Sequence, residues 1–297
     1  MIVGDDGKLK RSVPDALMSV LARIGRDRDV LDVGRLTGTG NSSYLVSYAD
    51  DRIVVRFDGD ETDGLVDREL EYRHGYLAAR QELGPEILYA DLAGGILITR
   101  FVEGTRFDQL IRPFSCASLG RLAQLIGKLQ ESEGFGGLMD PWQKISLYLD
   151  DAKLGEPEAE ANFGPLWSSL EVLRYKTAVD PDDLVACHVD PVPENLLDRE
   201  QGAILLDWEY AARSHRLWDI AYFASEARLT HDERVRLLHA FGQAEKQKEF
   251  QQWIVVAKAV SFAWCLARRA RAPDERETWD LALVERRHNL QRCLEAI

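Results

Sequence analysis

Cysteine is scarce in this sequence, and no two cysteines lie close together. The 297 residues include Cys116, Cys187, Cys265 and Cys293, without a Cys-x-x-Cys pair. This spacing excludes a disulfide-rich framework and the common cysteine-based zinc and redox motifs. The first residues, MIVGDDGKLKRS, are too polar for a secretory signal. We therefore expect reduced thiols and a cytoplasmic location.

A long apolar run is also missing. The most apolar segment, WIVVAKAVSFAWCLA from Trp253, has 15 residues and contains Lys258. A helix that spans a bilayer needs about 20 apolar residues. The segment therefore predicts a buried helix, and we expect no insertion into a membrane.

Basic residues are fewer than acidic residues in this sequence. The chain has 37 Lys and Arg against 50 Asp and Glu, a net charge of -13. Such a charge repels phosphate backbones, so nucleic acid is not an expected partner. The same charge would concentrate a cationic small molecule near the protein, although many soluble proteins are equally acidic.

The first hundred residues carry strand and helix patterns in a definite order. After a short helix near Pro14, the β-rich runs SSYLVSYAD and RIVVRF predict a hairpin, and PEILYADLAGGILITRF predicts another that turns at Gly94-Gly95. Between them, GLVDRELEYRHGYLAARQELG predicts a helix with Val66, Leu70 and Leu77 on one face. These segments predict a small antiparallel sheet with one helix.

Helical patterns dominate the rest of the chain. A stripe at helical spacing is formed by Leu119, Leu122, Ala123, Ile126 and Leu129, and the sequence from about Asp219 onward is helical in pattern. The chain therefore predicts an α+β fold with two lobes, 1–101 and 102–297. The first has a small antiparallel sheet plus a helix, and the second is mainly helical.

The stretch CHVDPVPENLL carries the chemistry. In kinases, an Asp accepts the proton of the attacking hydroxyl and an Asn five residues later reaches a magnesium ion. Asp190 and Asn195 have that separation, and Asp207 follows a short apolar strand, where the second metal carboxylate belongs. His188 is expected to brace the loop, and Asp219 to accept backbone hydrogen bonds that fix it. The pattern predicts phosphoryl transfer.

The first lobe supplies residues suited to a nucleotide. The segment GTGNSSYLV resembles a Gly-rich phosphate loop, although a Gly-rich hairpin turn is an open alternative. Arg56 takes the place of the usual phosphate-binding lysine and keeps its charge. Glu71 on the following helix is its expected ion-pair partner. The predicted phosphate-loop contacts are Gly38, Gly40, Asn41, Ser42 and Ser43.

These residues resemble the choline/ethanolamine kinase family, in the aminoglycoside-phosphotransferase-like branch of the protein-kinase-like fold. The likeness is carried by CHVDPVPENLL and LLDWEYAARSHRLWDIAYFASEA, with weaker matches in RELEYRHGYLAARQELGPEIL, ILITRFVEG and LIGKLQESEGFGGLMDPWQKISLYL. It implies ATP-dependent phosphorylation of a small cationic amino alcohol, most of all choline or ethanolamine, with Mg2+. It also implies Asp190 as base, Asn195 and Asp207 as metal ligands, and adenine contacts at Thr99, Phe101 and Val102.

The acceptor side departs from the family. The resemblance places the acceptor cation at Trp264, but Ala267 stands where eukaryotic choline kinases have a second tryptophan. We therefore expect one aromatic wall to be missing. The candidate rings are Trp208, Tyr210, Trp218, Tyr222 and Trp264, of which at least half are expected in the core. The predicted substrate contacts are Asp190, Glu209, Trp218, Glu226 and Trp264.

Other functions stay open at this stage. An aminoglycoside or other small-molecule kinase would need late acidic residues, for which Glu275, Glu277 and Asp280 are available. A catalytically silent nucleotide-binding module is a further alternative. Protein kinase activity is disfavoured, because 11 residues between Asp207 and Asp219 leave no room for a long activation segment. The acceptor, a homodimer and the number of magnesium ions are left open.

Overall fold

The chain folds into two compact units. The structure is a computed structural model that describes residues 14–36, 41–59, 66–157, 161 and 163–295. The first unit extends to Gly104 and also includes Ile204–Tyr210, and the second comprises Thr105–Ala203 and the chain from Ala211 onward. Residues 204–210, predicted from sequence within the second lobe, therefore pack with the first unit.

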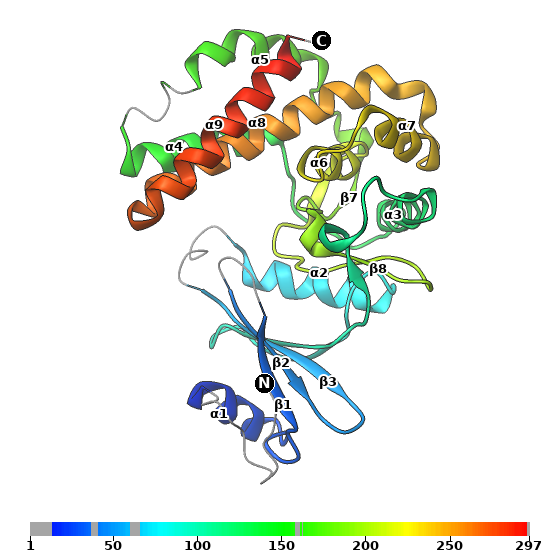
Figure 1. The fold of residues 1–297 in the computed structure, drawn as a ribbon, viewed down its shortest axis with the longest axis vertical. Helices are drawn as coiled ribbons and strands as arrows, with labels where there is room; N and C mark the ends of the chain where they lie inside the picture. Colours follow the sequence, from blue (N-terminus) through cyan, green and yellow to red (C-terminus); the bar gives the residue numbers. More distant parts are fainter. Residues whose placement is uncertain (1–13, 37–40, 60–65, 158–160, 162, 296–297) are drawn as a thin grey trace. The chain divides into compact units, whose positions relative to one another are not determined.

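The first unit has the order of elements that its sequence predicts. Its described strands form an antiparallel five-stranded sheet in the order β1-β2-β3-β5-β4 (Figure 1). The predicted succession of a hairpin, a helix and a second hairpin is confirmed, and β1 adds a further strand at the edge. The elements are α1 (Asp15–Arg23), β1 (Asp32–Leu36), β2 (Ser42–Ser47), β3 (Arg52–Phe57), α2 (Arg68–Arg80), β4 (Ile87–Asp91) and β5 (Ile96–Arg100).

Strand alternation decides which side of the sheet holds the core. In β3, Ile53 and Val55 are buried and pack with Leu17 and Leu21 of α1. Because successive side chains point to opposite faces of a strand, Arg56 points away from this core. Ser43 of β2 and Leu97 of β5 flank Arg56 in register on neighbouring strands.

The buried face of α2 differs from the predicted one. Val66, Leu70 and Leu77 are only half-buried, and the most buried helix positions are Glu71, His74, Gly75 and Ala78. A Cβ atom at Gly75 would lie 3.1 Å from the Ile87 Cδ1 atom, so the helix approaches β4 closely there. The apolar pattern misses this face because Glu71 is buried as one partner of an ion pair.

A close backbone approach joins residues 204–210 to the first unit. The Leu205 N–H donates to the Leu83 carbonyl at 2.8 Å. A Cβ atom at Gly84 would lie 2.7 Å from Trp208 Nε1, so glycine is required at this position. Trp208, a candidate ring from sequence, is 4% exposed and is a core residue here. Asp207 thereby belongs to the same unit as Arg56.

The second unit is mainly helical, as predicted. The expected stripe on α3, from Leu119 to Leu129, is buried. In the described residues, β7 pairs antiparallel with β10, and β6 with β8. The elements are β6 (Thr105–Arg106), α3 (Cys116–Gln130), α4 (Pro141–Gly155), α5 (Gly164–Lys176), β7 (Leu184–Cys187), β8 (Leu196–Asp198), β10 (Ala212–His215), α6 (Trp218–Glu226), α7 (His231–Ala240), α8 (Gln247–Arg271) and α9 (Arg276–Leu294).

Helix α8 is the central helix of the second unit. It packs against α4, α6 and α9 (Figure 1). Residues Ala244–Arg271 are long and apolar enough to cross a membrane by length and composition, but 78% of the most apolar window is buried within the structure. This burial favours the predicted interpretation of the segment as a buried core helix.

Candidate active site

The loop that follows β7 brings the predicted base and amide together. The Asn195 side chain donates through Nδ2 to the Asp190 carbonyl at 3.1 Å and to Asp190 Oδ2 at 3.3 Å. The five-residue separation in sequence therefore corresponds to a direct contact in space. A carboxylate and an amide oxygen held this way are suited to a proton acceptor beside a ligand for a hard cation.

The backbone before Asp190 is strained and clamped. Val189 has φ 75°, a conformation that is rare for a β-branched residue. Its N–H donates to Asp219 Oδ1 at 2.9 Å, and its carbonyl accepts from Trp218 Nε1 at 2.9 Å. The His188 N–H donates to Asp219 Oδ2 at 2.8 Å. The prediction that Asp219 accepts backbone hydrogen bonds that fix the loop is confirmed.

Trp218 has a structural position rather than the predicted contact with substrate. Its side chain is 0% exposed, and its ring packs against Trp253 and Tyr222. Trp218 and Asp219 are the first two residues of α6. Trp218 bonds the carbonyl group of Val189 and Asp219 bonds its N–H group, so the start of one helix holds both polar groups of the Val189 backbone. Trp218 thus positions the loop that carries Asp190, and its burial favours this structural role over the predicted contact with substrate.

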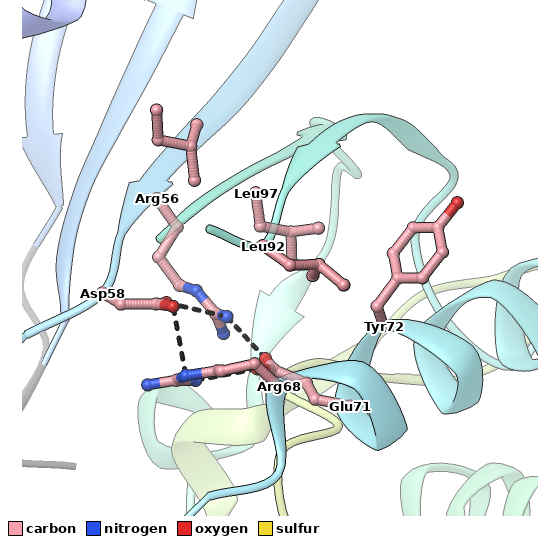
Figure 2. Close-up of a pocket in the computed structure, with 8 residues that line it drawn as sticks. Arg56, Asp58, Arg68, Glu71, Tyr72, Leu92 and Leu97 are labelled. Atoms are coloured by element: carbon pink, nitrogen blue, oxygen red, sulfur yellow. Dashed lines mark hydrogen bonds and ion pairs between the residues drawn. The ribbon is translucent and has the colours of Figure 1, made fainter. Parts of the chain in front are cut away.

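A network of charges fills the site of the first unit. Arg56 contacts Glu71 at 2.5 Å, Asp58 at 3.2 Å and Asp207 at 3.2 Å. Figure 2 shows Arg68 converging with Arg56 on Asp58 and Glu71. Burial lowers the pKa of Arg56, but the charges of Glu71, Asp207 and Asp58 outweigh that effect and raise it. The guanidinium is therefore permanently charged.

Three carboxylates of this network could hold a metal ion. Oxygen atoms of Glu71, Asp207 and Glu209 lie within 4.8 Å of one another. Burial and, after it, the charges of Asp207 and Glu71 raise the pKa of Glu209 to about 7, against the opposing effect of the arginines. Asp207 has φ 63°, a strained backbone that is common at functional sites. An all-oxygen set with excess negative charge suits Mg2+.

The contacts of Glu209 differ from the predicted ones. Sequence predicts a substrate contact, but Glu209 lies with Glu71 and Asp207 in the first unit and pairs with Arg68 at 3.3 Å. These contacts favour a part in the charged network of the first unit. Tyr210 belongs to the same unit as Glu209.

The predicted nucleotide contacts are described in part. Gly38 and Gly40 lie outside the described residues. Asn41 accepts from the Gly59 N–H at 3.2 Å. Ser42 and Ser43 begin β2, opposite Phe57 and Arg56. At the other end of the sheet, Thr99 pairs with Val54, and the Phe101 N–H donates to the Arg52 carbonyl at 2.9 Å, ahead of Val102.

A second cluster lies on the second unit, and we call Glu226, Ser261 and Trp264 the cation site. Arg286 donates to Glu226 at 3.1 and 3.2 Å and contacts the Ser261 hydroxyl. Its guanidinium carbon lies over the Trp264 ring, 5.9 Å from the centroid. A carboxylate, a hydroxyl and an indole ring here surround a positive charge, which is the arrangement that binds organic cations.

The cation site contains residues that sequence reasoning missed. The ring of Trp279 on α9 meets Trp264 edge-on, with centroids 5.5 Å apart, so a second tryptophan is present despite Ala267. Arg286 comes from the same helix. Neither residue lies in a recognisable motif, and a helical pattern near the C-terminus does not reveal which side chains reach a neighbouring helix.

Tyr222 is a buried residue on which charges of both the cation site and the predicted base act. Burial raises the pKa of Tyr222 well above its ordinary value, and the negative charges of Asp190 and Glu226 raise it further, while Arg286 lowers it. All these residues belong to the second unit. The charges of Asp190 and of Glu226 in the cation site therefore both act on one buried phenol.

Comparison with known proteins relates this chain to a phosphotransferase family. Residues 34–253 match the model of a family described as "Phosphotransferase enzyme family". Protein LicA of Haemophilus influenzae is 26% identical over 220 residues, which are 72% of this chain and 64% of that protein. Ethanolamine kinase 2 of Mus musculus is 28% identical over 197 residues, 62% of this chain and 49% of that protein. The matched regions thus span less than two thirds of these relatives.

Solved structures establish the fold. The choline kinase LicA of Streptococcus pneumoniae superimposes with a TM-score of 0.77 at 21% identity and covers 95% of this chain and 98% of its own. A choline/ethanolamine kinase family protein from Mesorhizobium loti gives a TM-score of 0.76 at 21% identity, with 95% and 94% covered. The expected α+β, protein-kinase-like fold is confirmed.

Proposed function

We propose that this chain, which belongs to the phosphotransferase enzyme family, transfers the γ-phosphate of ATP to the hydroxyl group of a small cationic amino alcohol, choline or ethanolamine. The family membership covers the transfer of phosphate. The relatives are named as a choline kinase and as ethanolamine kinases, which supports the choice of acceptor.

The observation that carries the proposal is that one unit contains both Asp190 and the cation site. A carboxylate in a clamped loop belongs to the same unit as a site whose carboxylate and indole already surround one positive charge, and both carboxylates act on the buried Tyr222 hydroxyl. An amino alcohol joins a hydroxyl to a cation within a few bonds, so its two ends match a base and a cation site in one unit. A neutral alcohol would make no use of Glu226.

Asp190 would act as general base. The acceptor oxygen forms a bond to the γ-phosphorus as the bond from that phosphorus to the β-γ bridging oxygen breaks, and ADP leaves. The hydroxyl proton passes to a carboxylate oxygen of Asp190. Asn195, by donating to Asp190, fixes the orientation of that carboxylate before the reaction.

The first unit would hold the nucleotide. Arg56, oriented by Glu71, suits the phosphates, and Asp207 with Glu209 and Glu71 offers oxygen ligands for Mg2+. We also propose Asn195 as a magnesium ligand, as the sequence predicts. Magnesium, when bound, would neutralise charge that develops on the transferred phosphate. We propose further that the protein is cytoplasmic, binds no nucleic acid, does not insert into a membrane, and can form a homodimer.

A screen of acceptors tests the proposal. Purified protein with Mg-ATP is offered choline, ethanolamine, related amino alcohols, thiamine and aminoglycosides, and both ADP formation and the phosphorylated product are measured. We expect product from an amino alcohol and none from the other classes. Phosphorylation of an aminoglycoside without any amino alcohol product would refute the proposed acceptor, and ADP formation without any product would refute the transfer.

A further inference from the structure

The chain's own Arg286 occupies the cation site. One guanidinium nitrogen, Nη1, bonds both carboxylate oxygens of Glu226 and also the Ser261 hydroxyl. The side chains of Arg286 and Glu226 are 30% and 14% exposed, so the pair is largely withdrawn from water. An acceptor cation that enters this site meets a resident positive charge.

Loss of a proton does not remove this charge. Burial lowers the pKa of Arg286, but the carboxylate of Glu226 and the neighbouring Tyr222 raise it above its ordinary value. Arginine therefore keeps its charge at any pH at which the protein is folded. An incoming cation has to share Glu226 with the guanidinium or displace it.

The geometry permits sharing only for some cations. Each oxygen of Glu226 accepts one bond from Arg286, and a carboxylate has about four lone-pair positions in total. A primary ammonium group has three N–H donors and can use the remaining positions. A trimethylammonium group has no N–H donor and depends on aromatic faces. The guanidinium lies over the ring of Trp264, which such a group would need.

We propose that Arg286 is a specificity-determining residue that makes this site favour amino alcohols with an unmethylated ammonium group over those with a quaternary ammonium group. The proposal rests on the proposed function and names the substrate class within it. The carboxylate, hydroxyl and indole stay suited to a cation, and the resident guanidinium decides which cation fits beside it.

The first test compares two acceptors. The kcat/KM values for choline and ethanolamine are measured for the wild type, for Arg286→Gln and for Arg287→Gln, an exposed neighbour on α9. Wild type and Arg287→Gln should prefer ethanolamine. In Arg286→Gln the ratio of choline to ethanolamine should rise roughly tenfold, because one cation-π contact becomes available to the methyl groups. An unchanged ratio would overturn the proposal.

The second test uses binding alone, so that it does not depend on turnover. Calorimetry with tetramethylammonium should give a Kd for Arg286→Gln that is roughly tenfold lower than for the wild type, and Trp264→Ala in the same variant should abolish the gain. If this gain appears but no amino alcohol is phosphorylated, the assignment of Arg286 stands and the proposed function fails. If amino alcohols are phosphorylated but neither ratio nor affinity changes, only the assignment fails.

Loss of the buried ion pair could unfold the glutamine variant. Arg286→Lys keeps a positive partner for Glu226 but replaces the planar fork by a compact charge. It should shift the acceptor ratio towards choline by roughly threefold while the circular dichroism melting curve stays cooperative. A folded lysine variant with the wild-type ratio would overturn the proposal.

Discussion

Replacing Arg56 by methionine removes the cation at the centre of the charged network while keeping much of the buried side-chain volume. Arg56 is 12% exposed and its closest partner, Glu71, is 5% exposed. Removing one partner of a buried ion pair costs about 3–5 kcal/mol, because the other charge stays buried without compensation. Asp58 and Asp207 are more exposed and can be hydrated. We therefore expect the lower end, about 3 kcal/mol of unfolding free energy.

The matched control is Arg52, on the same face of the same strand. Its side chain is 39% exposed and its partner Glu103 is 80% exposed. An exposed ion pair contributes about 0–1 kcal/mol, so Arg52→Met should cost no more than about 1 kcal/mol. Urea unfolding followed by circular dichroism gives both values. Nearly equal losses in the two variants would refute the view that the Arg56 network is buried and coupled.

The change in stability on addition of magnesium gives an independent test with the same variants. Arg56 pairs with Asp207, a predicted metal ligand, so the guanidinium and a metal ion would compete for the same carboxylate. Without nucleotide, magnesium should raise the stability of Arg56→Met more than that of the wild type, because a ligand that binds the folded state stabilises it. Arg56→Lys should recover part of both stability and turnover. No added effect of magnesium on the methionine variant would place the metal elsewhere.

Three further predictions concern the metal, the acceptor and acid stability. Asp207→Ala should weaken binding of Mg-ATP, and unchanged affinity by calorimetry would contradict its metal role. In the Arg286→Gln background, where the ring is available, Trp264→Ala should raise the KM for choline about 2- to 30-fold with little change for ATP, the range that one cation-π contact gives; equal KM values would make the ring structural. Burial raises the pKa of Glu233, but bonds from Arg112, Thr230 and Phe114 outweigh this and lower it from 4.5 to about 2. The lowered pKa contributes about 3 kcal/mol to the unfolding free energy above pH 4.5, and this contribution is lost as the pH falls towards 2. The difference in unfolding free energy between wild type and Glu233→Gln should therefore shrink between pH 4.5 and pH 2. A constant difference over this range would contradict the assignment.

Local patterns were enough to predict much of the fold. The succession of elements in the first unit and the buried stripe from Leu119 to Leu129 follow from alternation and helical spacing. The face of α2 did not follow. Its buried positions include Glu71, and a charged residue enters a buried face only because a distant arginine pairs with it. The hydrophobic pattern along one helix contains no information about a partner that is distant in sequence.

The loop residues of the site were predictable, and the side chains around them were less so. Asp190 and Asn195 are neighbours because a short loop links them, and Asp219 was expected as their brace. Trp218 adjoins Asp219 and could equally have faced a substrate, and only tertiary packing buries it. Arg286 is separated from Glu226 by 60 residues, so only the packed helices reveal the contact.

The most direct test of the central claim is the transfer of labelled γ-phosphate to ethanolamine by Asp190→Asn in a single turnover, with ATP affinity measured on the same protein. Because the base contacts the acceptor hydroxyl and not the nucleotide, the account predicts a rate about 100- to 10,000-fold below wild type and an ATP Kd close to that of the wild type. A variant that retains more than about half of the wild-type rate would contradict the account.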